Sequence, residues 1–208
     1  MHVLLINGSP HAKGCTFTAL QVCADTLNHE GITTEIVHLG PRPIADCIAC
    51  GRCRQLDHAC IQTGDPVNDI LEKAAQADGF VFGTPVYYAH PSGRVLSALD
   101  RIFYAGSDLF AHKPGFAVAS ARRAGTTASL DALNKYFTIA QMPVVSSTYW
   151  NMVHGNTPEE VLQDAEGLQT MGNAARNLAW LLRCIQAGKA AGIEPPVAQR
   201  EHKTNFIR

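Results

Sequence analysis

The stretch HVLLINGSPHAKGCT, residues 2–16, decides the fold. Its first part, His2–Asn7, is a short run of leucine and β-branched side chains that is typical of a buried strand. A Gly-Ser-Pro turn follows, and a helical spacing then runs from about Thr16 to Glu30 on the apolar residues Phe17, Leu20, Ala24 and Leu27. Strand, turn and helix in this order predict the first unit of an α/β fold.

The same alternation continues outward from this unit. We expect further strands at 33–39, 78–87, 115–120 and 143–147, with the strand at 78–87 broken at Thr84–Pro85. Helices are expected at 67–77, 92–104 and around 130–140, and a long last helix should open on the capping box of Thr157, Pro158 and Glu160. Five strands alternating with helices predict a parallel sheet covered on both faces, in a doubly wound α/β fold of dinucleotide-binding or flavodoxin-like type.

The chain as a whole indicates one domain over residues 1–188. A loop rich in proline, glycine and cysteine is inserted at 40–64, and the polar, proline-broken residues 189–208 should form an extended arm that reaches onto a partner subunit.

The net charge of -1 leaves no positive surplus for a nucleic acid or a membrane surface. The apolar runs are too short for a bilayer span and the start lacks a secretory pattern, so we expect a cytoplasmic protein.

Three loops should meet where the parallel strands end, which is where such sheets bind ligands. The loop at 7–16 lacks the G-x-G-x-x-G pattern of a dinucleotide site and carries hydroxyls, glycines and one lysine instead. Together with the following helix N-terminus, these groups suit a terminal phosphate, although an ordinary turn has a similar composition. The loop GTPVYYAHPSG (83–93) offers aromatic side chains for a flat ring, and SARRAGT (120–126) offers small residues and two arginines.

The segments INGSPHAKGCT, GTPVYYAHPSGRVLSALDR and SARRAGT together resemble the NADPH-dependent FMN reductase family of flavodoxin-like proteins. The cysteine loop looks like that of the iron–sulfur flavoprotein branch. The resemblance implies a flavodoxin-like fold with a five-stranded parallel sheet and three groups of FMN-binding residues. The phosphate would be held by Ser9, His11, Lys13, Gly14, Cys15 and Thr16, the isoalloxazine would be lined by Pro85, Val86, Tyr87 and Tyr88, and its pyrimidine end would be closed by Ser120, Arg122, Arg123, Ala124 and Gly125.

Two positions depart from the family pattern. The family often has arginine or lysine where His11 stands and asparagine where Cys15 stands. Because histidine is charged only part of the time at neutral pH, Lys13 is expected to compensate for the missing cation. We name no certain catalytic residue, although His90 is a candidate proton donor to a quinone-type acceptor.

The implied activity is hydride transfer from NAD(P)H to FMN, followed by delivery of electrons to a quinone-like or other small acceptor. We expect a homodimer or homotetramer, with Tyr88, His90 and the cysteine loop around the open face of the flavin. An alternative is an electron carrier in which a [4Fe-4S] cluster exchanges electrons between a ferredoxin-like donor and FMN. A third alternative is a flavin-binding scaffold without a redox partner.

The motif CIACGRC, Cys47 to Cys53, puts three thiols at two-residue gaps, and Cys60 follows. This run suits a [4Fe-4S] cluster on Cys47, Cys50, Cys53 and Cys60, because short gaps let successive thiolates reach neighbouring irons. Zinc, a redox pair of Cys50 with Cys53, and a cluster-free loop are the alternatives. The isolated Cys23 and Cys184 lie on helical stripes and are expected in the core.

Overall fold

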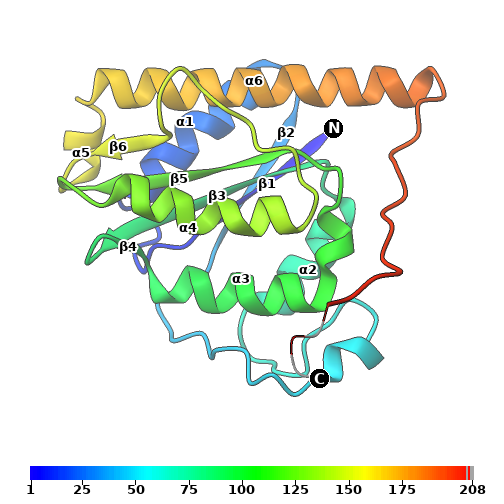
Figure 1. Cartoon of the computed structure of the whole chain (residues 1–208). Coiled ribbons are helices and arrows are strands. Elements are labelled where there is room, and N and C mark those ends of the chain that lie inside the picture. Colours follow the sequence, from blue (N-terminus) through cyan, green and yellow to red (C-terminus); the bar gives the residue numbers. More distant parts are fainter. Residues whose placement is uncertain (205, 207–208) are drawn as a thin grey trace.

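The computed structural model describes residues 1–204 and 206 of the chain. Figure 1 shows a central sheet between two layers of helices. The strands are β1 (His2–Asn7), β2 (Thr33–His38), β3 (Gly79–Tyr87), β4 (His90–Pro91), β5 (Gly115–Ala121) and β6 (Met152–His154). The helices are α1 (Cys15–His29), α2 (Val67–Gln76), α3 (Gly93–Gly106), α4 (Thr126–Ile139), α5 (Pro158–Val161) and α6 (Ala165–Ala190), with short 3-10 turns η1 (Arg52–Gln55) and η2 (Ser107–Phe110).

The sheet is doubly wound and its order is β2-β1-β3-β5-β6, all parallel, while β4 forms a small antiparallel hairpin with β3. The chain moves outward from β1 to β2, returns to β3 on the other side of β1, and then continues to β5 and β6. The order therefore reverses between β1 and β3, and the carboxyl ends of these strands form the edge where ligands of such sheets bind. The prediction of a flavodoxin-like α/β sheet is confirmed.

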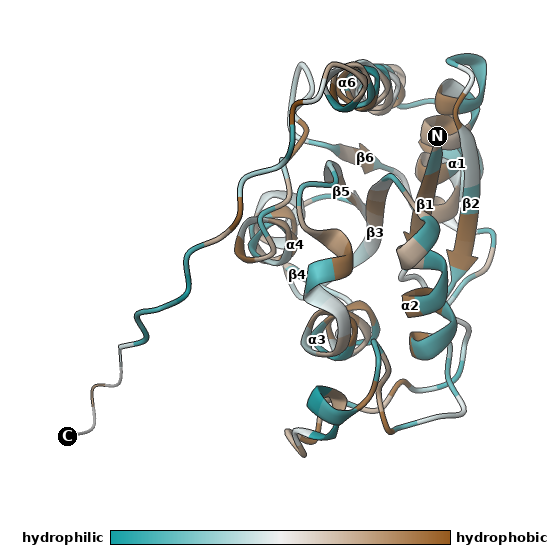
Figure 2. Cartoon of the chain, turned by 90° about the vertical axis from the view of Figure 1, so that its right-hand side faces the viewer, coloured by the Kyte–Doolittle hydropathy of each residue, from teal (hydrophilic) through white to brown (hydrophobic). Residues whose placement is uncertain are grey.

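The core lies in two layers because successive side chains of a strand point to opposite faces. In β1, Leu4 and Ile6 pack toward α2, α3 and α4, whereas Val3 and Leu5 pack toward α1 and α6. Figure 2 shows the two helix layers end-on, with α6 and α1 on one side of the sheet and α2 and α3 on the other. Apolar residues on both faces account for the near-continuous hydrophobic runs of β1 and β3.

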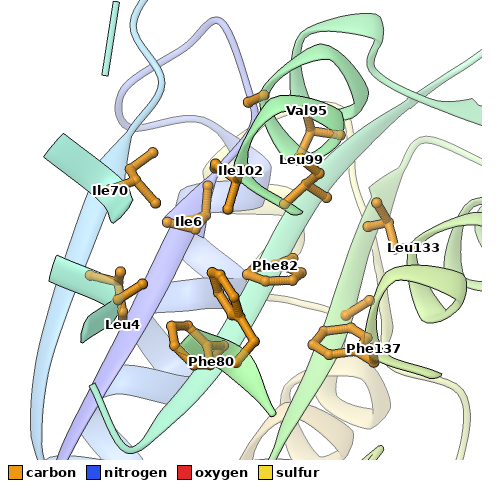
Figure 3. Close-up of a cluster of buried hydrophobic side chains, with 14 of the residues drawn as sticks. Leu4, Ile6, Ile70, Phe80, Phe82, Val95, Leu99, Ile102, Leu133 and Phe137 are labelled. Carbon is orange, nitrogen blue, oxygen red and sulfur yellow. The ribbon is translucent and has the colours of Figure 1, made fainter. Parts of the chain in front are cut away.

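Aromatic side chains fill the layer beneath α3 and α4. The rings of Phe82 and Phe137 stack with centroids 4.8 Å apart, and Phe80 lies 4.5 Å from Phe110. Figure 3 shows the rings of Phe80, Phe82 and Phe137 beside apolar side chains of α3 and α2, such as Leu99, Ile102 and Ile70. The large buried faces hold α3 firmly on the sheet, and α3 in turn supports the loops of the candidate site.

The expected edge strand at 143–147 is wrong. Val144 makes one isolated bridge to Gly115, after which the described chain bulges away and returns as β6 at Met152–His154. The backbone N–H of Val145 reaches Gly115 and that of Ala119 reaches Asn151. On this side of the sheet, the described chain therefore pairs with β5 only near its two ends, and the middle of β5 has no partner strand there.

Two expected element boundaries are also corrected. β3 does not break at Thr84–Pro85 but continues to Tyr87, because β1 ends opposite Gly83 and the missing N–H of Pro85 leaves no bond to β1 unmade. The capping box at Thr157 opens only the one-turn α5, and the long α6 starts at Ala165 with Asp164 as its cap.

The last residues of the described chain do not join the sheet. α6 ends at Ala190, and residues 191–204 are exposed and contain neither helix nor strand. Figure 2 shows this arm leaving the body of the molecule. The division at residue 188 and the contact of the arm with a partner stay predictions. None of the helices in the described part of the chain combines the length and apolar character that a bilayer span requires.

Candidate functional site

The loop between β1 and α1 is held in place by its own polar side chains. Asn7 is fully buried, accepts the backbone N–H of Ser9 (3.1 Å) and donates to the carbonyl of Ala12 (3.2 Å). The Ser9 hydroxyl accepts the N–H of His11, and a ring nitrogen of His38 lies 2.8 Å from the Ser9 carbonyl. These bonds shape the loop before any ligand arrives, so little ordering remains to be done on binding.

The helix that follows this loop begins without a side-chain cap. In the described chain no side chain accepts an N–H at the start of α1, whose cap residue is Gly14, and its first turn holds no acidic residue. The same is true of α4, whose cap residue is Gly125. By contrast, α3 is capped by Ser92, which accepts the N–H of Val95. Free N–H groups and a positive dipole end at α1 fit the phosphate of FMN.

The three predicted loops are joined to one another. Gly8 donates its N–H to Gly83 (2.9 Å), and the Ser92 hydroxyl donates to the Gly8 carbonyl (2.9 Å), which ties the first loop to the second. The hydroxyls of Thr16 and Ser120 lie 2.7 Å apart in a buried position, which ties the first to the third. The structure thus brings the predicted site residues of all three segments to one edge of the sheet.

The aromatic residues of the second loop stand in the open. Tyr88 is fully exposed and Tyr87 is about half exposed, at 47%. Tyr88 and Ala89 both have positive φ angles, 52° and 59°, which form the tight turn between β3 and β4. Two-residue hairpin turns commonly adopt this backbone, although usually with glycine or asparagine. An exposed ring on such a turn is available for stacking on a flat ligand.

The charged residues predicted for the site lie at its rim. His11, Lys13, His90, Arg122 and Arg123 are all exposed. His154, at the end of β6, places a ring nitrogen 3.1 Å from the carbonyl of Arg123 and so supports the third loop from behind. The basic side chains therefore lie around the carboxyl edge of the sheet and are exposed to solvent.

Cys15 occupies the first position of α1 and is half-buried. Burial raises the pKa of its thiol, partly offset by a backbone hydrogen bond, and nearby Glu160 and Glu159 raise it further. Since the ordinary thiol pKa is already above 8, Cys15 is neutral at pH 7 and adds no negative charge where a phosphate would sit.

Sequence reasoning missed the residues that hold the loops together. His38 and Ser92 bond the first loop from distant parts of the chain. Asn7 holds that loop from within, and the Thr84 hydroxyl accepts the N–H of Ser92 inside the second loop (3.0 Å). Asn7 had a local signal, because asparagine directly after a strand commonly starts a turn by bonding the backbone two residues on. The other three had none.

The four cysteines of the inserted loop line one pocket of about 230 Å³ against α3. Cys47, Cys53 and Cys60 are half-buried and Cys50 is exposed, and all are free thiols. Within the described residues, no three His, Cys, Asp or Glu side chains converge closely enough to hold a single metal ion. A [4Fe-4S] cluster makes a different demand, since each thiolate binds its own iron. Four free thiols around one pocket are the donor set that such a cluster takes.

The cysteine pocket and the carboxyl edge lie at opposite ends of α3. Arg94 near the start of α3 donates to the carbonyl of Gly40 (2.7 Å), whereas Cys53 donates to the carbonyl of Tyr104 near its end (3.5 Å). Figure 1 shows the inserted loop running beneath the helix. At 1.5 Å per residue, Arg101 lies about 12 Å along the helix from Gly93. Within one chain, therefore, the beginning of the loop approaches the carboxyl edge and the cysteines do not.

Comparison with known proteins decides the family. The family model described as NADPH-dependent FMN reductase matches residues 1–157, which include all three loops of the carboxyl edge and all four cysteines of the pocket. The chain belongs to this family. As a member of it, the protein is an NAD(P)H-dependent flavin oxidoreductase and a flavoprotein that uses FMN. The predicted family is thereby confirmed.

Curated relatives of this FMN reductase family member include iron–sulfur flavoproteins. One from Methanocaldococcus jannaschii is 30% identical over 195 residues, which are 89% of this chain and 100% of the relative. One from Methanosarcina thermophila is 26% identical and covers 91% of this chain and 99% of the relative. An FMN-dependent NADPH-azoreductase of Staphylococcus aureus is 28% identical over 55% of this chain and 57% of its own length.

Solved structures show the same fold. An NAD(P)H:quinone oxidoreductase from Methanothermobacter marburgensis superimposes with a TM-score of 0.65 at 18% identity, over 86% of this chain and 96% of that one. The protein RosB with a bound riboflavin phosphate derivative gives a TM-score of 0.66 at 16% identity, over 100% and 94%. At these identities the likeness supports the flavodoxin-like fold of the family and nothing finer.

Proposed function

We propose that the protein takes electrons from NAD(P)H through FMN, bound at the carboxyl edge of the sheet, and delivers them to a quinone-like or other small acceptor. The observation that carries the proposal is the uncapped start of α1 inside a preformed loop that bonds to both neighbouring loops. One protein of the same fold is an NAD(P)H:quinone oxidoreductase, which makes quinones the first acceptor class to test.

The proposed role of the first loop is to grip the phosphate. The N–H groups at the start of α1 and the hydroxyls of Ser9 and Thr16 supply hydrogen bonds, while Lys13 and His11 supply positive charge from the rim. The neutral thiol of Cys15 lets the chain approach closely without repelling the anion. Each of these groups can donate to the phosphate oxygens, which is what a phosphate monoester requires.

The proposed role of the other two loops is to orient the ring. Pro85, Val86, Tyr87 and Tyr88 would line the isoalloxazine, and the loop from Ser120 to Gly125 would close around its pyrimidine end with Arg122 and Arg123. When bound, FMN supplies the hydride and electron chemistry. The residues of this chain hold it, leave one face open to the nicotinamide, and place positive charge at the end where electron density builds up.

The test is a matched pair of substitutions on α1. Thr16→Val removes the hydroxyl that meets Ser120, whereas Thr26→Val removes a hydroxyl that bonds only the carbonyl of Val22, farther along the same helix. We expect Thr16→Val to weaken FMN binding about tenfold or more and Thr26→Val to leave it unchanged. Flavin fluorescence titration measures both. Equal affinities, or colourless protein that takes up no FMN, would contradict the proposed site.

The acceptor is tested by steady-state consumption of NADPH or NADH with an added quinone. The proposal expects turnover of both substrates by flavin-loaded wild type, and slower turnover at subsaturating FMN for Thr16→Val. A flavin-loaded protein that oxidises no nicotinamide with any quinone would point to the electron carrier or scaffold alternatives.

We further propose that Cys47, Cys50, Cys53 and Cys60 bind a [4Fe-4S] cluster, so that the protein also exchanges single electrons with a ferredoxin-like donor or acceptor. The specific observation in favour is that all four thiols line one pocket. The full-length relatives described as iron–sulfur flavoproteins support it. Zinc, a Cys50–Cys53 disulfide and a cluster-free loop remain the competing outcomes.

An iron and sulfide assay on anaerobically purified protein tests the cluster. We expect about four irons per chain and a broad brown absorption beneath the flavin bands. Cys50→Ala should lose this iron, whereas Cys184→Ala, an equally exposed cysteine on α6, should keep it. Zinc in place of iron, or iron-free anaerobic protein, would remove the cluster and leave the flavin proposal standing.

A further inference from the structure

Arg101 is the largest of the fully buried side chains, with 1% of its surface exposed. It lies on α3 and lines the cysteine pocket together with all four thiols. A buried guanidinium is costly unless every donor finds a partner. The partners of its hydrogen bonds therefore indicate the role of this buried charge.

The guanidinium bonds both ends of the cysteine loop. One terminal nitrogen donates to the carbonyl of Ala45 (3.3 Å), before the first cysteine, and the other donates to the carbonyl of Gln62 (2.8 Å), after the last. The carboxylate of Asp65 accepts a further bond. These contacts use the planar fork of arginine, which a lysine does not reproduce.

The Nε donor of Arg101 points at sulfur. Nε of Arg101 lies 3.3 Å from Sγ of Cys60, one of the four proposed cluster ligands. Structural anchoring of the loop needs only the carbonyl and carboxylate bonds. The N–H to sulfur adds a positive charge and a hydrogen bond at the place where a cluster would store its electron, and charges act strongly on each other when they are away from water.

We propose that Arg101 is a positioning residue that raises the reduction potential of an iron–sulfur cluster in the cysteine pocket, an inference that rests on the cluster proposed above. Uptake of one electron from a chemical reductant such as dithionite forms and breaks no bond and makes the thiolate-bound group more negative by one charge. A buried cation with an N–H on a ligand sulfur stabilises the more negative state, since hydrogen bonds to the sulfurs and net charge both set cluster potentials.

The experiment is an anaerobic redox titration of the cluster, read by electron paramagnetic resonance, in wild type and variants. Arg101→Met removes the charge and the N–H, and should lower the ratio of reduced to oxidised cluster about tenfold at a given potential, or about 59 mV for one electron. Arg101→Lys keeps the charge but loses the fork, so a smaller shift in the same direction is expected.

A variant that should shift the reduction potential in the opposite direction separates an electrostatic effect of Arg101 from its anchoring of the loop. Asp65→Asn removes the negative charge that partly neutralises Arg101, and should raise the potential. If the variants acted by damaging the loop, the reduction potentials of the Arg101 and Asp65 variants would shift in the same direction. Arg94→Lys is the matched control, because Arg94 also ties the loop to α3 but donates to the carbonyls of Gly40 and Pro41 and to no sulfur in the described chain.

Each outcome bears on the inference. Opposite shifts for Arg101→Lys and Asp65→Asn, with full iron content and an unchanged Arg94→Lys, support it, even if Arg101→Met does not fold. Full iron with unchanged potentials, or shifts of the same sign in both variants, overturns it and leaves the cluster in place. Iron-free wild type overturns the cluster proposal and this inference together.

Discussion

At the scale of single residues, Gly125 shows how closely the loops of the carboxyl edge approach each other. Its φ is +93°, and a Cβ built there would lie 2.4 Å from the Cα of Ala89 and 2.9 Å from a methyl carbon of Val86. Only glycine tolerates both the backbone angle and the contact. The third loop can therefore rest directly against the turn that carries Tyr88.

We expect Gly125→Ala to destabilise the protein by about 2–5 kcal/mol, because the left-handed backbone and the overpacking both cost free energy. It should also reduce the flavin retained on purification, since the two loops can no longer meet. Urea unfolding and flavin content measure the two effects. Gly93→Ala is the control, because its Cβ would meet no atom of the described chain within 4 Å. A neutral Gly125→Ala would show that the loops do not touch in solution.

The buried thiol of Cys23 predicts that the stability of the fold depends on pH. This thiol is fully buried on α1, and burial raises its pKa to about 12, with a backbone hydrogen bond offsetting part of the effect. The unfolded chain ionises this thiol near its ordinary pKa of about 8.5, but the folded chain does not. Its contribution to stability is therefore complete below pH 8.5 and is lost progressively as the pH rises from there toward about 12.

Above pH 8.5 the stability of wild type relative to Cys23→Ala should fall by up to about 1.4 kcal/mol per pH unit. Urea unfolding of both proteins at pH 7, 9 and 10 measures the difference. The matched variant Cys184→Ala should show no such trend, because Cys184 is exposed. The expectation that Cys184 lies in the core is wrong, since its position on α6 faces away from the sheet.

At the scale of elements, the two caps near residue 160 have different tasks. Thr157 accepts the N–H of Glu160 and caps only the single turn of α5. Asp164 accepts the N–H of Gly167 at the start of the 26-residue α6 and also the N–H of His154 in β6. It therefore joins the long helix to the edge of the sheet.

Asp164→Ala should cost about 1–2 kcal/mol of stability, because it removes a helix cap and leaves the His154 N–H without its acceptor. Thr157→Ala should cost less, since the one-turn helix contributes few buried groups. Thermal unfolding of the two variants under the same conditions compares them. If Thr157→Ala were the more damaging change, the long helix would begin earlier than described.

At the scale of the whole molecule, the arm after α6 is the least covered part of the described chain. Ile193 is 67% exposed and Val197 is 93% exposed. A second copy of the chain could cover these side chains, and the homo-oligomer remains a proposal.

Truncation after Gly192 should leave the fold of the body intact, because the arm residues up to 204 are all exposed. If the arm serves assembly, the truncated protein should sediment as a smaller species than the full chain, with unchanged circular dichroism. Velocity sedimentation over a range of concentrations measures this. A truncated protein of unchanged assembly size would give the arm no role in oligomerisation.

The candidate site could be predicted in part. The three loops were identified because each is a short, glycine-bearing segment directly after a strand, and parallel strands end at one edge of the sheet. The polar residues that join distant segments, Ser92 and His38, could not be identified, because their partners Gly8 and Ser9 lie in another loop. The same limit hid Arg101, whose place in a helical pattern looks like an ordinary surface position.

The sequence by itself determined the order of elements, the two-faced burial of β1 and β3, and the family, since these depend on residues that are near one another in the chain. Only the tertiary structure decided where β6 pairs, which helix the Thr157 box opens, and that the four thiols share one pocket at the far end of α3 from the carboxyl edge. The physical reason is that edge pairing, capping and pocket lining depend on contacts between segments, and their free energies are set by the packed partner rather than by local preference.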